Sequence, residues 1–299
     1  MVPIPGGFPA ADRSENGIQV RVTDSLFTKL EADPAALVSS FTGSDELTFP
    51  VPASCDGTVE VCCNVQGPCG PLAIDLVEQS GDLPRLELSP VSGQSAIDLT
   101  LRARLKTESS NVGGSGFLTG NVDVDTNGGA TDDVTIRTRI KLPVDGTTNT
   151  TRVELQPQPG DSDAVTLLNL EPGDIDLGLC GLAGDTVKQL LIDEVTSTLS
   201  DELSAAIEEP LCKTCPGGAI SECGSFADAC TDGVCMRGNT CLQELGTSGR
   251  MLAALAFEDI SRGQAGAADV YEVAGGYASS NDDGVSVGLL SGMLPAGAA

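Results

Sequence analysis

The side chains of this protein that could do chemistry are its cysteines and its carboxylates, because the sequence contains no histidine. The absence of histidine excludes Ser-His-Asp and Cys-His catalysis and the usual zinc hydrolase sites. Asp and Glu together number 43, but their spacing singles out no carboxylate pair of the kind that glycosidases use. The sequence therefore predicts a protein that is not an enzyme. A carboxylate-based hydrolase stays open as a further hypothesis, which would need an acidic pair about 5–10 Å apart in a cleft.

The cysteines are expected to form disulfide bonds rather than to bind a metal ion. Eleven cysteines in 299 residues are typical of an oxidising compartment. They fall into two groups, which are Cys55, Cys62, Cys63 and Cys69, and then Cys180, Cys212, Cys215, Cys223, Cys230, Cys235 and Cys241. A zinc site would need repeated Cys-x-x-Cys pairs, and Cys212 with Cys215 is the only such pair in the sequence. Residues 213–245 are therefore expected to form a disulfide-rich insert, with too few apolar residues to fold without bridges.

One acidic segment resembles the start of a calcium-binding loop. Asp123, Asp125 and Asn127 have the required spacing, but the twelfth position is Val134, where calcium needs a bidentate glutamate. Asn127 is followed by Gly128, a pair that is typical of a tight hairpin turn. We therefore expect a polar turn rather than a calcium site, and the sequence predicts no cofactor.

The net charge of −27 argues against partners that are themselves acidic. Nucleic acids and anionic membranes attract proteins of the opposite sign, so neither is expected to bind by bulk attraction. Six basic residues nevertheless lie on two predicted strands: Arg102, Arg104, Lys106, Arg137, Arg139 and Lys141. We expect these charges to be paired rather than to bind an anion, with Asp123 and Asp125 as partners on a strand between them.

The compartment is predicted from the cysteines and from the apolar pattern. No apolar run is long enough to span a membrane, and the first residues lack the basic and apolar regions of a signal peptide. We expect a secreted, extracellular or cell-surface protein whose export signal was removed, or a piece of a longer precursor.

The clearest structural element is a long helix predicted over residues 181–209, between Cys180 and Cys212. Its apolar residues recur at every fourth position, at Val187, Leu191, Val195, Leu199, Leu203 and Ile207. Such a stripe must pack against an apolar surface. An interval of four overshoots one helical turn by about 40°, so the stripe winds around the helix and favours a twisted sheet as its partner.

Segments that alternate between apolar and polar residues supply that sheet, and their period of two predicts antiparallel strands with one buried face. These segments are residues 17–22, 74–76, 86–88, 97–105, 118–124, 134–142, 153–155, 165–170 and 175–179. A shorter N-terminal helix is predicted to begin near Asp24. The predicted fold class is α+β: a strongly curved antiparallel sheet, or half-barrel, wrapped around the long C-terminal helix and the shorter N-terminal helix, plus the disulfide-rich insert. Two strand-like runs in the tail, residues 269–273 and 285–290, must pair with the main sheet or begin a second domain.

This order of elements resembles the N-terminal barrel of the tubular lipid-binding family, which includes bactericidal/permeability-increasing protein, lipopolysaccharide-binding protein and the plasma lipid-transfer proteins. Residues 16–22, Asn-Gly-Ile-Gln-Val-Arg-Val, look like the opening strand of that family, and residues 26–41 look like its first helix. Residues 47–52, Leu-Thr-Phe-Pro-Val-Pro, lie where those proteins leave that helix through a proline. Residues 179–203 and Leu211-Cys212 look like the second helix and the cysteine that follows it. The resemblance covers about residues 14–212.

The resemblance implies a secreted lipid-binding protein that holds acyl chains of a phospholipid or another apolar lipid in an elongated apolar tube. It places the lipid contacts on both helices and on the inward faces of the strands, at Val20, Val22, Leu26, Phe27, Leu30, Leu99, Leu101, Ile136, Ile140, Val187, Leu191, Val195 and Leu199. It also implies a disulfide bond between Cys180 and Cys212, as a variant of the bridge that the family forms between a barrel strand and the second helix. The implied partners are a lipid and a membrane or lipoprotein surface, and no nucleic acid.

The sequence departs from the best-known family members in its charge, because lipopolysaccharide binders use a cationic tip and this sequence has 16 basic residues against 43 acidic ones. An alternative therefore stays open: an extracellular structural or adhesion protein with a fully packed barrel, in which the cysteine-rich insert carries out recognition. Four segments are predicted, namely a flexible lead-in (1–13), the barrel (14–212), the insert (213–245) and a linker that begins an incomplete second β-rich domain (246–299).

Overall fold

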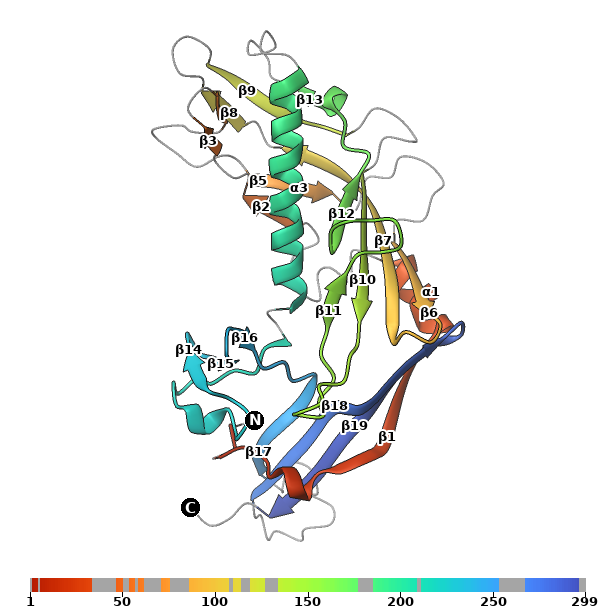
Figure 1. The fold of residues 1–299 in the computed structure, drawn as a ribbon, viewed down its shortest axis with the longest axis vertical. Coiled ribbons are helices and arrows are strands. Elements are labelled where there is room, and N and C mark those ends of the chain that lie inside the picture. Colours follow the sequence, from red (N-terminus) through yellow and green to blue (C-terminus); the bar gives the residue numbers. More distant parts are fainter. Residues whose placement is uncertain are drawn as a thin grey trace.

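The protein is described by a computed structural model, in which antiparallel sheets dominate and helices are few (Figure 1). The structure describes residues 2–4, 6–33, 47–50, 54–56, 59–61, 71–75, 86–107, 110–113, 119–126, 134–176, 185–208, 211–252 and 267–295. The fold is α+β, which confirms the predicted class at this level. Within the described residues the strands pair in four sheets, and none of these sheets closes into a barrel.

The largest sheet has seven strands in the order β11-β10-β7-β5-β2, with β6 also pairing with β7 and β12 also pairing with β10. Its strands are β2 (Leu47–Pro50), β5 (Pro71–Asp75), β6 (Leu86–Val91), β7 (Ala96–Thr107), β10 (Val134–Lys141), β11 (Glu154–Gln156) and β12 (Val165–Leu168). β7 and β10 pair directly, with Leu101 opposite Ile136 and Asp98 opposite Arg139. Because side chains alternate along a strand, this register gathers apolar residues on one face and charged residues on the other.

Among the described residues, two α-helices lie near this sheet. α1 (Asp24–Ala32) packs against β6 with Phe27 buried, and the Glu31 carboxylate accepts a hydrogen bond from the backbone N–H of Leu88 at 2.7 Å. α3 (Asp185–Glu208) corresponds to the long helix that the sequence predicts, and it runs alongside the strands of the large sheet (Figure 1). It contacts β12 and the short helix η2 (Pro172–Asp174), where the Lys188 ammonium donates to the carbonyl of Pro172 at 2.8 Å.

A five-stranded sheet has the order β13-β9-β8-β4-β3. Its strands are β3 (Ser54–Asp56), β4 (Val59–Val61), β8 (Ser110–Gly113), β9 (Thr119–Val124) and β13 (Ile175–Asp176). It is joined to the large sheet where Thr126 exchanges hydrogen bonds with the backbone of Leu105. β9 therefore belongs to a different sheet from β7 and β10, and the prediction that it lies between them is wrong. Alternation along each strand does not indicate which strand lies beside which.

A four-stranded sheet brings together the two ends of the described chain, in the order β1-β19-β18-β17. Its strands are β1 (Ser14–Thr23), β17 (Gly246–Leu252), β18 (Ala267–Asn281) and β19 (Gly284–Pro295). The tail strands β18 and β19 pair with each other, and β19 also pairs with the opening strand β1. A buried cluster on one face of this sheet consists of Ile4, Phe8, Tyr271, Val273 and Leu290.

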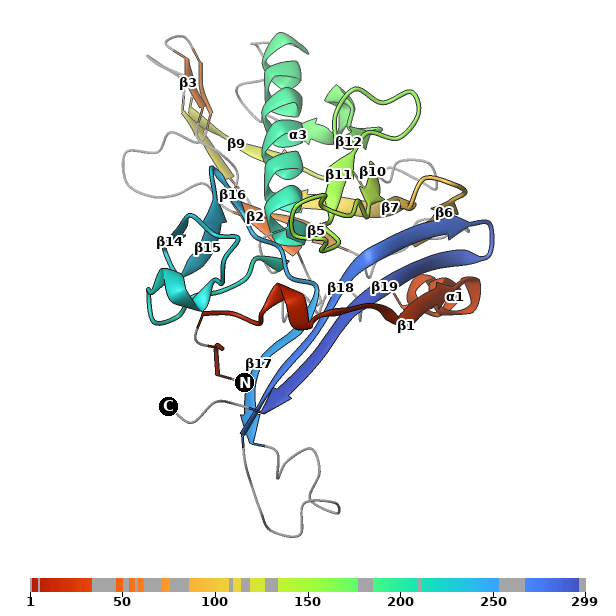
Figure 2. The ribbon, with the colours of Figure 1, turned by 60° about the horizontal axis from the view of Figure 1, so that its bottom comes forward.

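The cysteine-rich residues 211–245, called here the disulfide module, form a small unit beside the four-stranded sheet (Figure 2). Its elements are η5 (Ile220–Glu222), β14 (Ala229–Thr231), β15 (Val234–Arg237) and β16 (Thr240–Cys241). Three disulfide bonds hold it, and they are Cys212–Cys241, Cys215–Cys230 and Cys223–Cys235. The predicted disulfide-rich insert is therefore present. Another short helix, η1 (Ala10–Asp12), precedes β1.

Candidate functional site

An apolar row crosses four strands of the seven-stranded sheet. Leu86 on β6 lies opposite Leu101 on β7, Leu101 lies opposite Ile136 on β10, and Ile136 lies opposite Leu167 on β12. Leu86, Leu101 and Ile136 are only 2%, 8% and 2% exposed, and Leu167 is half-buried. We call the side of the sheet that carries this row the apolar face. It is the one-sided buried surface that the alternating sequence predicts.

The opposite face of the same sheet carries arginine–carboxylate pairs. They are Arg102–Glu87 at 3.2 Å, Arg104–Asp125 at 2.9 Å, Arg137–Asp161 at 3.2 Å and Arg139–Asp98 at 2.6 Å. The prediction that these arginines are paired is thus confirmed, but of the predicted partners only Asp125 appears in these pairs, with Arg104. The partners of the other three arginines are Glu87, Asp161 and Asp98. The hydrogen bonds that the Arg139 guanidinium donates to the Asp98 carboxylate raise the pKa of Arg139 above its ordinary value. Charges matched in this way leave little attraction for an external anion.

The structure brings together some of the residues that the resemblance assigns to a lipid site. Leu101 and Ile136 lie in the apolar row, and Leu99 and Ile140 lie half-buried on the same face. On α1, Phe27 is buried, Leu30 is half-buried and Leu26 is 43% exposed. Two further residues of the predicted set, Val20 and Val22, lie on β1, which belongs to the separate four-stranded sheet. Val20 is 48% exposed and Val22 is half-buried. The α3 side chains of the predicted set lie outside the described part of the structure, and these are Val187, Leu191, Val195 and Leu199.

The predicted disulfide between Cys180 and Cys212 is wrong, because Cys212 is bonded to Cys241. The backbone N–H of Lys213 donates to the carbonyl of Leu242 at 2.7 Å, which lays the two segments antiparallel and sets the Cα atoms of Cys212 and Cys241 5.6 Å apart. That separation is near the most common value for a disulfide. Cys180 lies outside the described residues.

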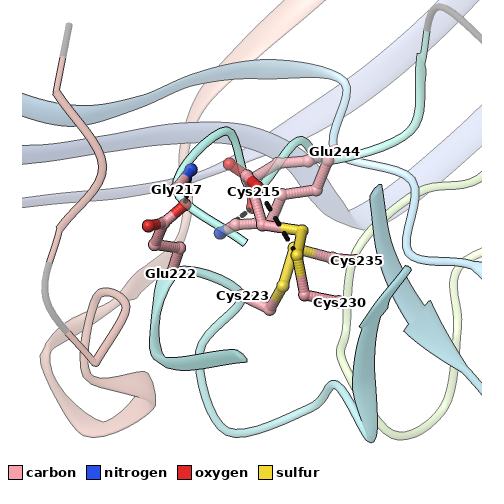
Figure 3. The surroundings of a disulfide bond; sticks show 8 residues. Cys215, Gly217, Glu222, Cys223, Cys230, Cys235 and Glu244 are labelled. Carbon is pink, nitrogen blue, oxygen red and sulfur yellow. Dashed lines mark hydrogen bonds and ion pairs between the residues drawn. A yellow bond between two sulfur atoms is a disulfide. The ribbon is translucent and has the colours of Figure 1, made fainter. Parts of the chain in front are cut away.

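The six cysteines from Cys212 to Cys241 pair among themselves, in three disulfide bonds. The sulfur atoms of Cys215, Cys223 and Cys235 lie within 4.8 Å of one another (Figure 3). They belong to two neighbouring disulfides, however, and an oxidised sulfur offers no thiolate to a metal ion. This cluster is therefore a structural core and not a metal site.

The segment considered for calcium uses one of its carboxylates in a different way. Asp125 accepts two hydrogen bonds from Arg104, from Nε to Oδ1 and from Nη2 to Oδ2, each at 2.9 Å. This bidentate geometry is typical of a strong arginine–carboxylate pair. Asp123 lies on β9, and Asn127 lies outside the described residues.

A loop between β10 and β11 connects the large sheet to the two units beside it. We call residues 142–153 the junction loop. The Thr151 N–H donates to the carbonyl of Ala274 at 2.7 Å, and the Gly276 N–H donates to the carbonyl of Asn149 at 2.8 Å, so the loop pairs with β18. Gly275 lies between these contacts, and a Cβ atom there would collide with the Asn149 carbonyl oxygen. Glycine is thus the residue that permits this close approach.

The junction loop and the disulfide module enclose a cavity of about 260 Å³. Asp145 is one of its lining residues, and its Oδ1 accepts hydrogen bonds from the N–H groups of Thr147 at 2.8 Å and Thr148 at 2.9 Å. Arg152 and Arg237 approach the same carboxylate at 3.8 Å and 3.7 Å. The hydrogen bond from the Thr148 N–H lowers the pKa of the Asp145 carboxyl group, and the Thr147 N–H and the positive charge of Arg152 lower it further. Burial acts in the opposite direction, but the net shift of the pKa is downward.

Sequence reasoning did not identify this cavity. The run Asp-Gly-Thr-Thr at residues 145–148 is a turn signal, which accounts for the loop. Arg237, however, comes from the disulfide module, 92 positions beyond Asp145, and no local pattern links the two.

The N-terminal lead-in, predicted to be flexible, contributes two side chains to the buried cluster of the four-stranded sheet. Phe8 stacks on Tyr271 with ring centroids 5.4 Å apart, and Ile4 is 7% exposed. The Arg13 guanidinium lies 4.2 Å from the Tyr271 ring centroid, within the range of a cation–π contact. Burial raises the pKa of the Tyr271 hydroxyl. Figure 2 shows the lead-in passing between the disulfide module and this sheet.

Comparisons with known proteins assign no family: no protein-family model matches the chain, and no curated protein matches it. Among the helices of the described segments, none combines the length and the apolar character that crossing a membrane requires. The three disulfide bonds indicate an oxidising environment of the extracellular type.

Proposed function

We propose that this chain is a secreted lipid-binding module that holds acyl chains of a phospholipid or another apolar lipid. The observation that carries the proposal is the apolar row from Leu86 through Leu101 and Ile136 to Leu167, which crosses four strands without a polar interruption. Each methylene group moved from water onto such a surface contributes about 0.8 kcal/mol. A lipid can therefore be held by its chains, without a charged clamp.

In this proposal the sheet curves as a half-barrel around α3 and α1, and the acyl chains lie in an elongated tube between the helices and the apolar face. α3 supplies the second wall, because its sequence repeats an apolar residue at every fourth position. The arginine–carboxylate pairs stay on the outer face of the seven-stranded sheet, where they keep the protein soluble. The resemblance to the tubular lipid-binding family supports the same arrangement, with a membrane or lipoprotein surface as the source of the lipid. The proposal includes no catalytic step.

The proposal is tested by comparing substitutions on the two faces of β7. Leu99 lies on the apolar face opposite Leu88, and the next residue, Thr100, lies on the charged face opposite Glu87. Leu99→Trp should fill the tube and lower the uptake of fluorescently labelled phospholipid from vesicles at least about tenfold. Thr100→Trp is the matched control and should take up lipid as the wild type does.

Circular dichroism and the thermal midpoint establish that both variants fold, and Leu167→Trp on β12 repeats the test at a second half-buried position of the apolar face. Equal uptake by the variants of the two faces, or no uptake by the wild type, would contradict the proposal.

A second candidate function is an extracellular structural or adhesion protein in which the barrel is fully packed and the disulfide module carries out recognition. The cavity lined by Asp145 and Arg237 favours this second function, because the cavity is polar and lies beside the disulfide module rather than at the apolar face. In this case the wild type binds no lipid and Leu99→Trp leaves ligand binding at the module unchanged.

A further inference from the structure

The cavity between the junction loop and the disulfide module has the size and the lining of a binding site for a small polar molecule. Thr148 and Thr150, 7% and 8% exposed, form its buried side, and Thr147 and Thr240 are exposed at its opening. Its volume of about 260 Å³ is just below the usual range of about 300–1,000 Å³ for pockets that bind drug-sized ligands. The cavity therefore suits a compact ligand.

The charges around the cavity balance, which favours a neutral ligand. Arg152 and Arg237 supply two positive charges, and Asp145 supplies one negative charge. The second negative charge comes from Glu154, whose carboxylate accepts a hydrogen bond from Arg152 Nη2 at 2.7 Å. An anion would have to lie beside the Asp145 carboxylate in a protein whose net charge is −27. Electrostatic repulsion therefore disfavours phosphate, sulfate and carboxylate ligands.

The charged groups of the cavity keep unused hydrogen-bonding capacity. Each guanidinium has five N–H donors, and within the described part of the chain Arg152 donates to Glu154 and Arg237 donates to Thr147. The distances of 3.7 and 3.8 Å to Asp145 are too long for hydrogen bonds, so these ion pairs leave the donors free. Arg152 Nε has no hydrogen-bond partner among the described residues.

Asp145 is an ionised acceptor held in a fixed position. Its Oδ1 is bound by the N–H groups of Thr147 and Thr148, while Oδ2 lies 3.8 Å from Arg152 Nη1. A pair of adjacent hydroxyl groups matches this arrangement, because each hydroxyl can donate to the carboxylate and accept from a guanidinium. Threonine hydroxyls and the Gln243 side chain add further polar groups to the lining.

We propose that this cavity binds one neutral sugar unit through two adjacent hydroxyl groups, with Asp145 as the acceptor and Arg152 and Arg237 as the donors. No aromatic ring lines the cavity in the part of the chain that the structure describes, so hydrogen bonds carry the recognition. The site is shared by the disulfide module and the junction loop, since Arg237 belongs to the former and Asp145 to the latter. It lies apart from the apolar face and does not depend on lipid binding.

The test is an NMR titration of the full-length, ¹⁵N-labelled protein with D-mannose, D-galactose and myo-inositol, and separately with inorganic phosphate. The proposal predicts saturable shifts of the Thr147 and Thr148 amide signals with at least one of the three polyols, and weaker or no binding of phosphate. Arg237→Ala should weaken polyol binding at least about tenfold, because it removes a charged donor. Arg237→Lys, which keeps the charge without the planar fork, should also weaken it.

Arg21→Ala is the matched control, because Arg21 is an exposed arginine that bonds Asn281 and Ser286 on the four-stranded sheet and does not line the cavity. It should bind the polyols as the wild type does. The proposal is overturned if none of the three polyols shifts these amide signals, if phosphate binds more tightly than all of them, or if Arg237→Ala binds like the wild type.

Discussion

The side-chain amide of Gln243 makes both hydrogen bonds of a β-bridge with the backbone of Val153. Its Oε1 accepts from the Val153 N–H at 2.7 Å, and its Nε2 donates to the Val153 carbonyl at 3.1 Å. A single side chain of the disulfide module thereby takes the place of a neighbouring strand for the last residue of the junction loop. This contact joins the disulfide module to the junction loop, and Gln243 is also one of the residues that line the cavity with Asp145.

Removing this amide should loosen the module. Gln243→Ala deletes both hydrogen bonds and leaves the N–H of Val153, a residue only 6% exposed, without its partner. We expect the free energy of unfolding to fall by about 1–3 kcal/mol, as measured by chemical denaturation. Gln189→Ala on α3 is the control, because Gln189 is an exposed glutamine whose amide bonds Asp193 on the same helix. If Gln189→Ala lowered the free energy of unfolding by as much as Gln243→Ala, the contact between Gln243 and Val153 would contribute no more to stability than an exposed hydrogen bond.

The disulfide pairing can be mapped directly. Proteolysis of the unreduced protein followed by mass spectrometry should yield linked peptides for Cys212–Cys241, Cys215–Cys230 and Cys223–Cys235. Replacing both Cys223 and Cys235 by serine should cost about 3 kcal/mol, since the bridge closes a short loop in the unfolded chain. A linked peptide that joins Cys180 to Cys212 would contradict the described pairing.

Because β18 approaches the junction loop so closely, we predict that position 275 tolerates only glycine. Gly275→Ala should destabilise the protein by about 1–3 kcal/mol, because the new methyl group would displace the Asn149 carbonyl from its hydrogen bond with the Gly276 N–H. Gly17→Ala on β1 is the control, since a Cβ atom there meets no other atom within 4 Å. Thermal unfolding of the two variants compares them, and equal midpoints would contradict the close approach.

Asp145 should contribute to stability in a pH-dependent way. Its pKa is lowered in the folded protein, so it stabilises the fold above the ordinary aspartate pKa of about 3.9 and this contribution is lost as the pH falls through the folded-state value. Asp145→Asn keeps an acceptor oxygen but not the charge, so at neutral pH we expect a loss of about 1 kcal/mol. The difference from the wild type should shrink as the pH falls below about 4.

Denaturation curves over this pH range test the prediction for Asp145. Asp12→Asn, at an exposed position, is the control and should follow the wild type at every pH. A difference between Asp145→Asn and the wild type that stays constant as the pH falls would show that the charge of Asp145 does not stabilise the fold.

The elements that the sequence predicts well are those whose signals are local. Strands β7 and β10 follow from the alternation around Leu101 and Ile136, and α1 follows from the polar residue at Asp24 before an apolar turn. The pairing of the arginines follows from the balance of charges on one face, although their individual partners depend on strand order.

The relationships that sequence reasoning missed are those between distant segments. The pairing of β1 with β19 joins the two ends of the described chain, and no local pattern indicates it. The bond from Cys212 to Cys241 depends on the hydrogen bond between Lys213 and Leu242, which only the folded module reveals. The cavity was missed for the same reason, since its charged groups come from two units of the fold.

The measurement that tests the proposed function most directly is native mass spectrometry of the protein purified from its own host under mild conditions. If the apolar face lines a lipid tube, the protein should carry one or more bound lipids, and their masses should disappear after extraction with organic solvent. The same protein should then take up labelled phospholipid again. A protein that shows only its bare mass, and that takes up no labelled phospholipid, would contradict the proposal that this chain holds lipid.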